Sequence, residues 1–146
     1  MTIKALIRNI SLIIALNALV ACSESEHYPK QYLGFKHTYR EFTFPKTEDT
    51  HDIIVTVIAT EKSDKDRKVT ITSQWNAGGG SWKPSKEAIF QLLDKSVTIP
   101  AQKKSANVRL RIFPRRIKQS ETVYLTCKPQ NRDIHSTQIT LKLNIK

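Results

Sequence analysis

The chain of 146 residues has little sulfur, with two cysteines and one methionine. Two cysteines, Cys22 and Cys127, are too few for a disulfide-stapled scaffold or a multi-cysteine metal site. The four histidines lie far apart in the sequence and none belongs to a His-Glu-x-x-His pattern, so no zinc site is predicted. Neither a Gly-x-Ser-x-Gly nucleophile elbow nor a phosphate-binding loop is present. The sequence therefore predicts no metal, no cofactor and no enzymatic activity.

Long hydrophobic runs are also absent. The apolar stretch of residues 10–20 is short for a membrane span, and two polar residues interrupt it. It follows two basic residues and ends at the small residue Ala21, which is the pattern of an export signal. Cys22 directly follows Leu19-Val20-Ala21, and a cysteine in this place marks the lipobox of bacterial lipoproteins.

In such lipoproteins the peptide before the cysteine is removed and the cysteine is acylated. Each buried methylene of the acyl chains contributes about 0.8 kcal/mol, so several chains anchor a protein firmly. The sequence predicts a signal peptide over residues 1–21 and a membrane anchor at Cys22. The alternative is an ordinary secretory signal with a coincidental cysteine.

Residues 22–37 are polar, contain Pro29 and Gly34, and show neither helical nor strand periodicity. This composition is typical of a flexible tether. The remaining residues, 38–146, suffice for one domain and are too few for two. We therefore expect a tether and one folded domain, held at the bacterial outer membrane by the lipid.

The balance of charge is strongly basic. Loss of residues 1–21 removes Lys4 and Arg8 but no acid, which lowers the formal net charge from +11 to +9. The positive electrostatic potential of such a protein attracts anionic partners such as nucleic acid, acidic glycans or lipid head groups. No helix-turn-helix, zinc finger or aromatic RNA platform motif is present, so nucleic acid is not expected as a partner. The alternative, which we favour, is a solvated basic surface that keeps an anchored domain soluble.

Short runs of β-branched and aromatic residues begin at Tyr39, and most alternate with a period of two, as half-buried strands do. In residues 53–59 the side chains that would point to either face of a strand are mostly apolar, which predicts a central strand. Pro100 predicts the end of a strand or a sheet edge. Seven strands are expected: residues 39–44, 53–59, 69–75, 97–99, 107–112, 122–127 and 139–146.

Seven strands with breaks about every 8–15 residues fit an all-β, antiparallel two-sheet sandwich better than an α/β arrangement. Only residues 85–93 could instead form a short helix or an irregular strand. Cys127 shares the parity of Val123 and Leu125, which predicts a buried and inert thiol.

The segment 95–112, which contains Ile99-Pro100-Ala101, resembles a signature of Bacteroidetes lipoproteins with immunoglobulin-like or Calx-beta-like domains. The order of the surrounding elements is similar to one such family, the domain of unknown function 4843, over roughly residues 40–145. The resemblance implies an immunoglobulin-like/Calx-beta-like sandwich. The family has no assigned catalytic residues, so none is carried over to this chain.

Two features depart from this family. Gln102 stands where a glycine usually follows Ile-Pro-Ala, and the chain stops at Lys146 where many relatives continue. In the same phylum an acidic stretch after the lipidated cysteine can direct a lipoprotein to the cell surface. Ser23-Glu24-Ser25-Glu26 resembles that signal in part, so we expect display at the cell surface rather than on the periplasmic face.

Trp75 and Trp82 flank three successive glycines, Gly78-Gly79-Gly80. The two indoles could stack on sugar rings or pack on a partner protein. The alternative, which we favour, has Trp75 filling the core by its parity with Val69 and Ile71, while the glycines turn the chain.

Arg109, Arg111 and Lys142 project from predicted strands on the parity opposite to the apolar one, and further basic residues follow at 115–118. If their strands are neighbours, these side chains form one basic face for an acidic polysaccharide or an anionic head group. The alternative, again favoured, is a solvated outer face.

Together these features predict a membrane-anchored lipoprotein with a non-catalytic binding domain, used in cell-surface adhesion or accessory glycan binding. The alternative is a structural envelope lipoprotein that docks onto a partner protein of a secretion or pilus assembly. The candidate ligand-binding residues are Trp75, Trp82, Arg109, Arg111 and Lys142. Cys22 is the residue whose role the sequence defines best.

Overall fold

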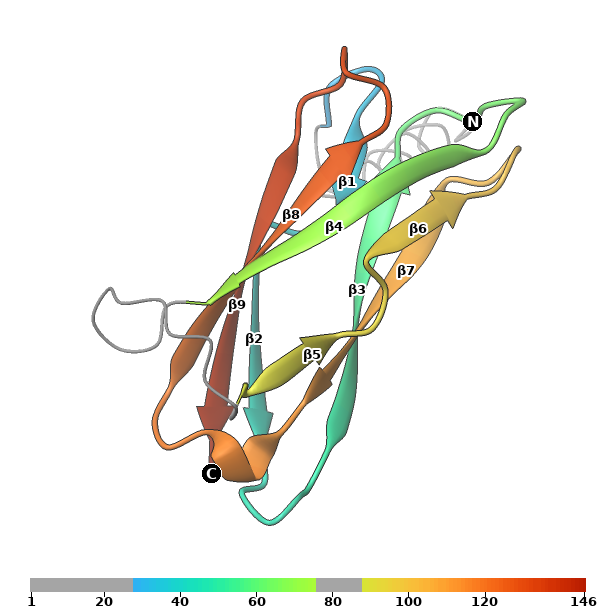
Figure 1. Ribbon diagram of the computed structural model, residues 1–146. Coiled ribbons are helices and arrows are strands. Elements are labelled where there is room, and N and C mark those ends of the chain that lie inside the picture. The colour runs from blue at the N-terminus through green and yellow to red at the C-terminus, as the bar shows by residue number, and fades with distance from the viewer. Residues whose placement is uncertain (1–27, 76–87) are drawn as a thin grey trace, which may run out of the picture.

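The computed structural model describes residues 28–75 and 88–146, which form two curled β-sheets packed face to face (Figure 1). The predicted all-β sandwich is confirmed, with nine strands rather than seven. A short 3-10 helix, η2 (Pro114–Arg116), precedes β8. The strands are β1 (Leu33–Phe35), β2 (Tyr39–Phe44), β3 (His51–Ala59), β4 (Arg67–Trp75), β5 (Phe90–Leu92), β6 (Ser96–Ile99), β7 (Ser105–Ile112), β8 (Glu121–Pro129) and β9 (Thr137–Ile145).

One sheet has the strand order β1-β3-β7-β5 and the other β2-β9-β8-β4-β6. β3 therefore lies inside its sheet, as the run of residues 53–59 predicted. β6 lies at an edge and ends just before Pro100, also as predicted. One pairing departs from the antiparallel expectation, because β2 runs parallel to β9. Alternation of apolar and polar residues marks a strand but does not encode its direction.

β1 lies within residues 22–37, the range predicted as a tether. Leu33, Gly34 and Phe35 are all buried, and β1 pairs with β3. The folded domain thus begins earlier than residue 38, and the predicted boundary was placed too late. A strand of three residues that is buried on both faces shows no alternation, so its pattern could not be distinguished from that of the tether.

The segment predicted as a short helix or an irregular strand, residues 85–93, is described from residue 88 onward. Its residues 90–92 form β5, which pairs with β7. The Phe113 amide donates to the Ile89 carbonyl at 2.8 Å and continues this pairing. The irregular-strand alternative is therefore the correct one for these residues.

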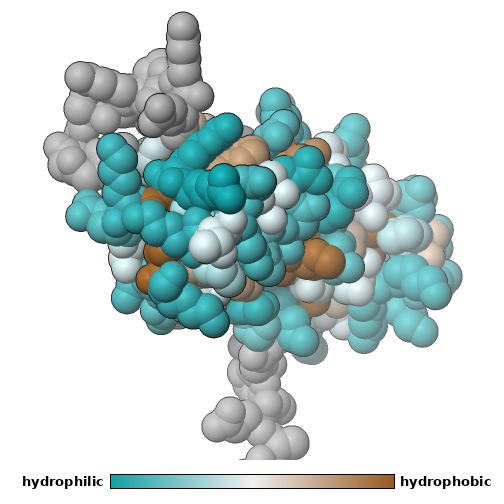
Figure 2. All heavy atoms as spheres, turned by 90° about the horizontal axis from the view of Figure 1, so that it is seen from below, coloured by the Kyte–Doolittle hydropathy of each residue, from teal (hydrophilic) through white to brown (hydrophobic). Residues whose placement is uncertain are grey.

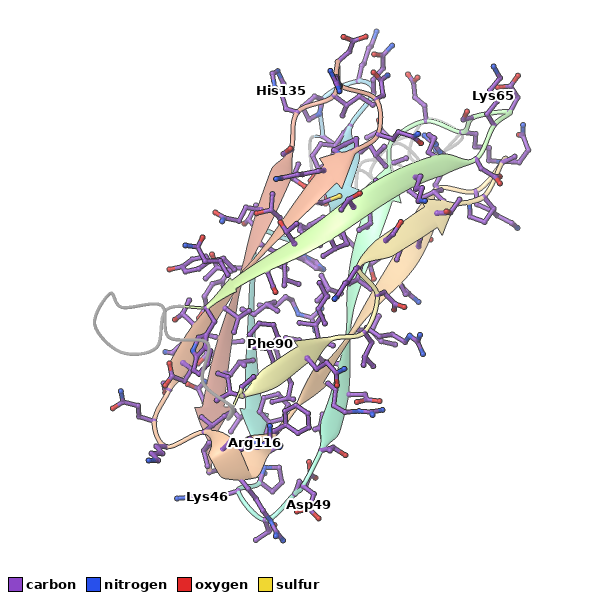
Figure 3. The ribbon with its side chains drawn as sticks, viewed as in Figure 1. Lys46, Asp49, Lys65, Phe90, Arg116 and His135 are labelled. Carbon is purple, nitrogen blue, oxygen red and sulfur yellow. The ribbon has the colours of Figure 1, made fainter. Side chains whose placement is uncertain are left out.

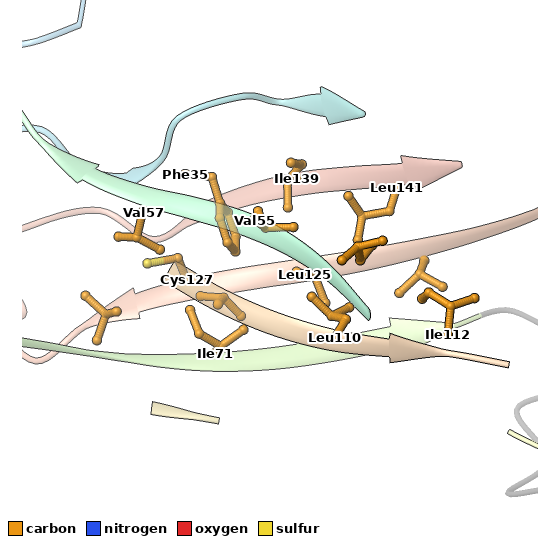
Figure 4. Packing of buried hydrophobic residues seen from close by; sticks show 14 of the residues in the cluster. Phe35, Val55, Val57, Ile71, Leu110, Ile112, Leu125, Cys127, Ile139 and Leu141 are labelled. Carbon is orange, nitrogen blue, oxygen red and sulfur yellow. The ribbon is translucent and has the colours of Figure 1, made fainter. Parts of the chain in front are cut away.

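The core lies between the sheets and consists of the inward residues of almost every strand (Figure 4). Side chains such as Leu110, Leu125 and Leu141 are fully buried, and each contributes about 1.5–3 kcal/mol by its removal from water. Cys127 is among the fully buried residues, and burial raises the pKa of its thiol to about 11. The predicted buried thiol is thereby confirmed.

Within residues 28–75 and 88–146, no helix is long and apolar enough to cross a membrane. The predicted signal peptide and the predicted lipidation site, Cys22, lie outside these described residues.

Candidate functional site

The outer side of the sheet β2-β9-β8-β4 carries a continuous set of polar and aromatic side chains, here called the polar face. Alternation along each strand creates it, because the inward residues of these strands form the core and the outward ones face solvent. Its outward residues include Tyr39, Glu41 and Thr43 on β2; Thr140, Lys142 and Asn144 on β9; Thr122, Tyr124 and Thr126 on β8; and Thr70, Thr72 and Gln74 on β4.

The strand register sets two tyrosines on one cross-strand row of the polar face. Tyr39 lies opposite Thr140, Thr140 opposite Tyr124, and Tyr124 opposite Gln74. Adjacent strands are about 4.8 Å apart, so the two tyrosines stand about 10 Å from one another. Tyr39 is 50% exposed and Tyr124 is half-buried. A row of this kind offers two aromatic rings with hydrogen-bonding groups between and beside them.

Next to this row, the Glu41 carboxylate is held by three neighbours. The Tyr39 hydroxyl donates to Glu41 Oε2 at 3.1 Å, and Asn144 Nδ2 donates to Oε1 at 2.5 Å. Lys142 Nζ lies 3.5 Å from Oε1, and the Ser120 hydroxyl donates to Asn144 Oδ1 at 2.6 Å. These partners, the Asn144 hydrogen bond first among them, hold the pKa of Glu41 below its usual range. Desolvation and the nearby Glu41 carboxylate raise the pKa of Tyr39.

The network fixes the directions in which the polar groups of the face point. Glu41 keeps its charge, and Lys142 supplies a cation beside it. A ligand that meets such groups does not have to order them on binding, which lowers the entropic cost of association.

Arg109 and Arg111 lie on β7, in the other sheet from Lys142, and project from its outer side. The hypothesis that these three residues form one basic face is therefore wrong, since their strands are not neighbours. The sequence pattern gave the outward parity of each residue but not the sheet to which each strand belongs.

Both arginines are also paired with acids. Arg109 Nε and Nη2 donate to the two carboxylate oxygens of Asp94 at 2.9 and 3.1 Å. Arg111 Nε and Nη2 donate to those of Asp52 at 2.8 and 3.0 Å. The hydrogen bonds from the two guanidinium groups hold the pKa of Asp94 and of Asp52 below its usual range. The positive charge expected at this surface is thus largely compensated.

Trp75 ends β4 and is half-buried, packed against the core cluster. Its indole Nε1 donates to Glu121 Oε2 at 3.2 Å. The core and Glu121 therefore hold this ring at the side of the sandwich. Trp82 and the glycines at 78–80 lie outside the described residues.

The end of the sandwich formed by residues 29–32, 60–68, 100–104 and 130–136 is here called the loop end; Figure 3 labels Lys65 and His135 on it. Two hollows open there, of about 280 and 450 Å³, and both are lined by Leu33 and Ile134. The smaller also contacts Tyr32 and His135, and the larger Lys65 and Arg67. Sequence reasoning missed this surface because it combines four separate loops.

No cluster of three or more His, Cys, Asp or Glu residues suited to a metal ion occurs in residues 28–75 and 88–146. The end opposite to the loop end, formed by residues 45–50 and 113–118, presents a mostly hydrophilic surface with small, separate apolar patches (Figure 2).

No family model and no curated protein matches the sequence. Solved structures nevertheless share the fold. A protein of Bacteroides ovatus provisionally described as carbohydrate-binding superposes with a TM-score of 0.60 at 10% identity, over 80% of this chain and 37% of that one. For the apo form of the Calx CBD1 domain the TM-score is 0.57 at 12% identity, with 78% and 96% covered. For the class 5 fimbriae chaperone CfaA it is 0.55 at 13% identity, with 79% and 57% covered.

At such low identities the likeness shows the fold alone. The chain adopts an immunoglobulin-like sandwich of the kind found in Calx-beta and PapD-like domains, as expected. It spans little more than a third of the Bacteroides protein and little more than half of the fimbrial chaperone. Membership of the family known as domain of unknown function 4843 stays a prediction from the sequence.

Proposed function

We propose that the protein is a membrane-anchored lipoprotein whose non-catalytic sandwich domain binds glycan chains through the polar face. The observation that carries the proposal is the row of Tyr39, Thr140, Tyr124 and Gln74 beside the oriented Glu41 network. Aromatic rings pack on the apolar faces of sugar rings, while fixed donors and acceptors meet the hydroxyl groups.

The dimensions of the polar face favour a chain over a single sugar. The two tyrosines stand on strands about 10 Å apart, which is more than the width of one pyranose ring, so an extended saccharide would contact both of them. The face is an open sheet surface, which suits the side of a polymer. The likeness of the fold to a Bacteroides protein with a provisional carbohydrate-binding role supports this choice of ligand.

The anchor and the location rest on the sequence. The lipobox before Cys22 supports acylation, and the acidic stretch at 23–26 supports display on the outer surface of the outer membrane. A glycan-binding domain at that site would serve adhesion or the capture of polysaccharide for other proteins.

Binding to a panel of immobilised neutral and acidic polysaccharides tests the ligand. Tyr39→Ala and Tyr124→Ala should each weaken binding about tenfold, as expected when an exposed ring that stacks on a ligand is removed. The matched control is Ile54→Ala, because Ile54 is exposed to the same extent as Tyr39, at 52% against 50%, but lies on the other sheet. Equal losses in all three variants, or no retained polysaccharide, would contradict the proposal.

Membrane partitioning tests the anchor separately. Cys22→Ser should shift the protein from the membrane fraction to the soluble fraction of the envelope, since no acyl chain is then attached. A variant that still sediments with membranes would show that the lipobox assignment is wrong, whatever the outcome of the glycan experiment.

The second candidate is docking onto a partner protein of a secretion or pilus assembly. The observation that favours it is the shared fold with fimbrial chaperones, among them CsuC in its complex with the tip adhesin subunit CsuE from Acinetobacter baumannii. This candidate predicts a stoichiometric complex with one envelope protein, found by cross-linking in cells, and no binding to the polysaccharide panel.

A further inference from the structure

We infer that the loop end is a membrane-docking surface, whose lysines lie against the head groups of an anionic bilayer. The inference rests on the lipid anchor proposed above and adds the orientation of the domain on the membrane. It leaves the polar face clear of the lipid, because that face is the side of the sandwich and not its end.

The loop end carries an excess of positive charge. It holds eight cationic side chains against four carboxylates, Glu61, Asp64, Asp66 and Asp133. None of the five ion pairs found among the described residues includes a residue of the loop end. Asp66 instead accepts a hydrogen bond from the Ala101 amide at 2.7 Å. The cations are Lys30, Lys62, Lys65, Arg67, Lys68, Lys103, Lys104 and Arg132.

The chain enters the fold beside this end. The Pro29 carbonyl accepts hydrogen bonds from the Tyr32 amide at 3.1 Å and from the Thr60 hydroxyl at 3.4 Å. Tyr28, the first described residue, donates from its hydroxyl to the Lys36 carbonyl at 2.6 Å. Five residues lie between Cys22 and Tyr28, so the six residue-to-residue steps of this link span at most about 20 Å.

The length of the link favours the loop end over the opposite end. The Pro29 carbonyl lies at Thr60, just beyond the loop-end terminus of β3. The Tyr28 hydroxyl reaches Lys36, whose amide donates to the Thr56 carbonyl at 2.9 Å. The entry point therefore lies beside the segment of β3 between Thr56 and Thr60. At about 3.4 Å per residue along β3, Ala59 at the loop end is at most about 10 Å from this segment, and His51 at the other end is at least about 17 Å from it. Beyond His51 lies a further turn. A link of about 20 Å therefore reaches a membrane at the loop end with slack, but must be fully extended for the opposite end to touch it.

The loop end also has one aromatic ring suited to the interface between lipid and water. Tyr32 lines the smaller hollow together with Leu33 and Ile134. The Tyr28 ring packs on Tyr32 at 4.9 Å between centroids, and its hydroxyl donates to the Lys36 carbonyl beyond β1. Tyrosine is enriched at this interface because its ring is apolar and its hydroxyl is polar.

Hydrogen bonds between the loops hold these groups in place. The Arg67 guanidinium donates to the carbonyls of Glu61 and Lys103, each at 2.9 Å. The Gln102 amide donates to the Ser63 carbonyl at 2.7 Å. Two of the lysine-bearing loops are thus joined into one platform, so that their charges approach a flat surface together.

The test uses the lipidated protein, purified from cells and reconstituted into vesicles of phosphatidylcholine with about 30% phosphatidylglycerol, or of phosphatidylcholine alone. Amine-labelling rates of single lysines are read by mass spectrometry. In the anionic vesicles Lys62, Lys65 and Lys103 should react about tenfold more slowly than in the neutral ones, and high salt should abolish the difference. Lys46 and Lys118, at the opposite end, should react equally in both.

Two charge-reversal variants give matched controls. K62E/K65E/K103E should restore rapid labelling of the remaining Lys68 and Lys104, whereas K46E/K118E/K146E, with the same change in charge, should leave their protection intact. Because all six lysines are exposed, both variants should keep the thermal unfolding temperature of the parent, which is measured alongside. If one of the variants fails to fold, the comparison of labelling rates in the parent protein, in anionic against neutral vesicles, tests the docking surface on its own.

Equal labelling of both ends in an anchored protein would overturn the docking surface and leave the anchor standing. Protection at Lys46 and Lys118 instead would assign docking to the opposite end. A protein that carries no lipid would overturn both proposals, and the Cys22→Ser partitioning experiment identifies that case.

Discussion

Gly34 packs directly against the side chain of Thr137. A Cβ atom at Gly34 would come under 3.0 Å from three atoms of that threonine. The same Thr137 hydroxyl oxygen accepts a hydrogen bond from the Phe35 amide at 3.1 Å. β1 of one sheet is in this way fastened to the start of β9 of the other, and no side chain fits between them.

Gly34→Ala should therefore lower the free energy of unfolding by about 2 kcal/mol, the usual cost of overpacking a closed contact. Urea unfolding followed by circular dichroism measures this loss. The control is the double variant with Thr137→Ala, which removes two of the clashing atoms and should lose less stability than the sum of the two single changes. Additive losses would contradict the direct contact.

Gln102 adopts a left-handed backbone conformation, with φ at 64°. This geometry costs a residue with a Cβ atom about 1–2 kcal/mol and costs glycine little, although glycine loses more entropy on folding. Gln102→Gly should therefore raise stability by up to about 1 kcal/mol, while Gln102→Val should lower it. Thermal unfolding of the two variants checks the signs. The position is the one where the family resembled by this segment usually carries glycine.

How far the sequence predicts the fold depends on the length of each strand. The period-two patterns of residues 107–112 and 139–146 identify β7 and β9 without ambiguity, because one face of each strand is core and the other solvent. β1 and β5 have three residues each, which is too short for a period to be visible. The parallel pairing of β2 with β9 is also hidden, since it is decided by contacts distant in the sequence.

The surfaces were harder to predict than the strands. Outward parity was correct for Arg109, Arg111 and Lys142, but parity does not reveal that Arg109 pairs with Asp94 or that Lys142 lies in the other sheet. The polar face depends on the register among four strands, and the loop end depends on four loops. Such neighbours exist only after the chain has folded.

The two bidentate ion pairs predict a dependence of stability on pH. The pKa of Asp52 and of Asp94 is lower in the folded protein than in the unfolded chain, where it is about 4. Their contribution is therefore complete above about pH 4 and is lost as the pH falls through the lower, folded values. The urea midpoint should decline below about pH 4 in the parent.

Asp52→Asn and Asp94→Asn should each flatten that acid decline, because the substituted residue no longer titrates. Asp64→Asn is the control, since Asp64 belongs to no ion pair found among the described residues and lies on the loop end. If the urea midpoint falls as steeply below about pH 4 in the two test variants as in the control, the two ion pairs are not the cause of the acid dependence.

The thiol of Cys127 should react only when the sandwich opens. The side chain is fully buried and burial raises its pKa to about 11, so at pH 8 both access and the thiolate form are missing in the native state. In the Cys22→Ser variant, whose one thiol is Cys127, a disulfide reagent should label the native protein no faster than global unfolding permits. The labelling rate should then rise with urea in parallel with the unfolded fraction followed by circular dichroism. Rapid labelling without urea would mean that the core between β8 and β9 opens locally, and the sandwich would then not be the closed unit on which the predictions for Gly34 and Gln102 depend.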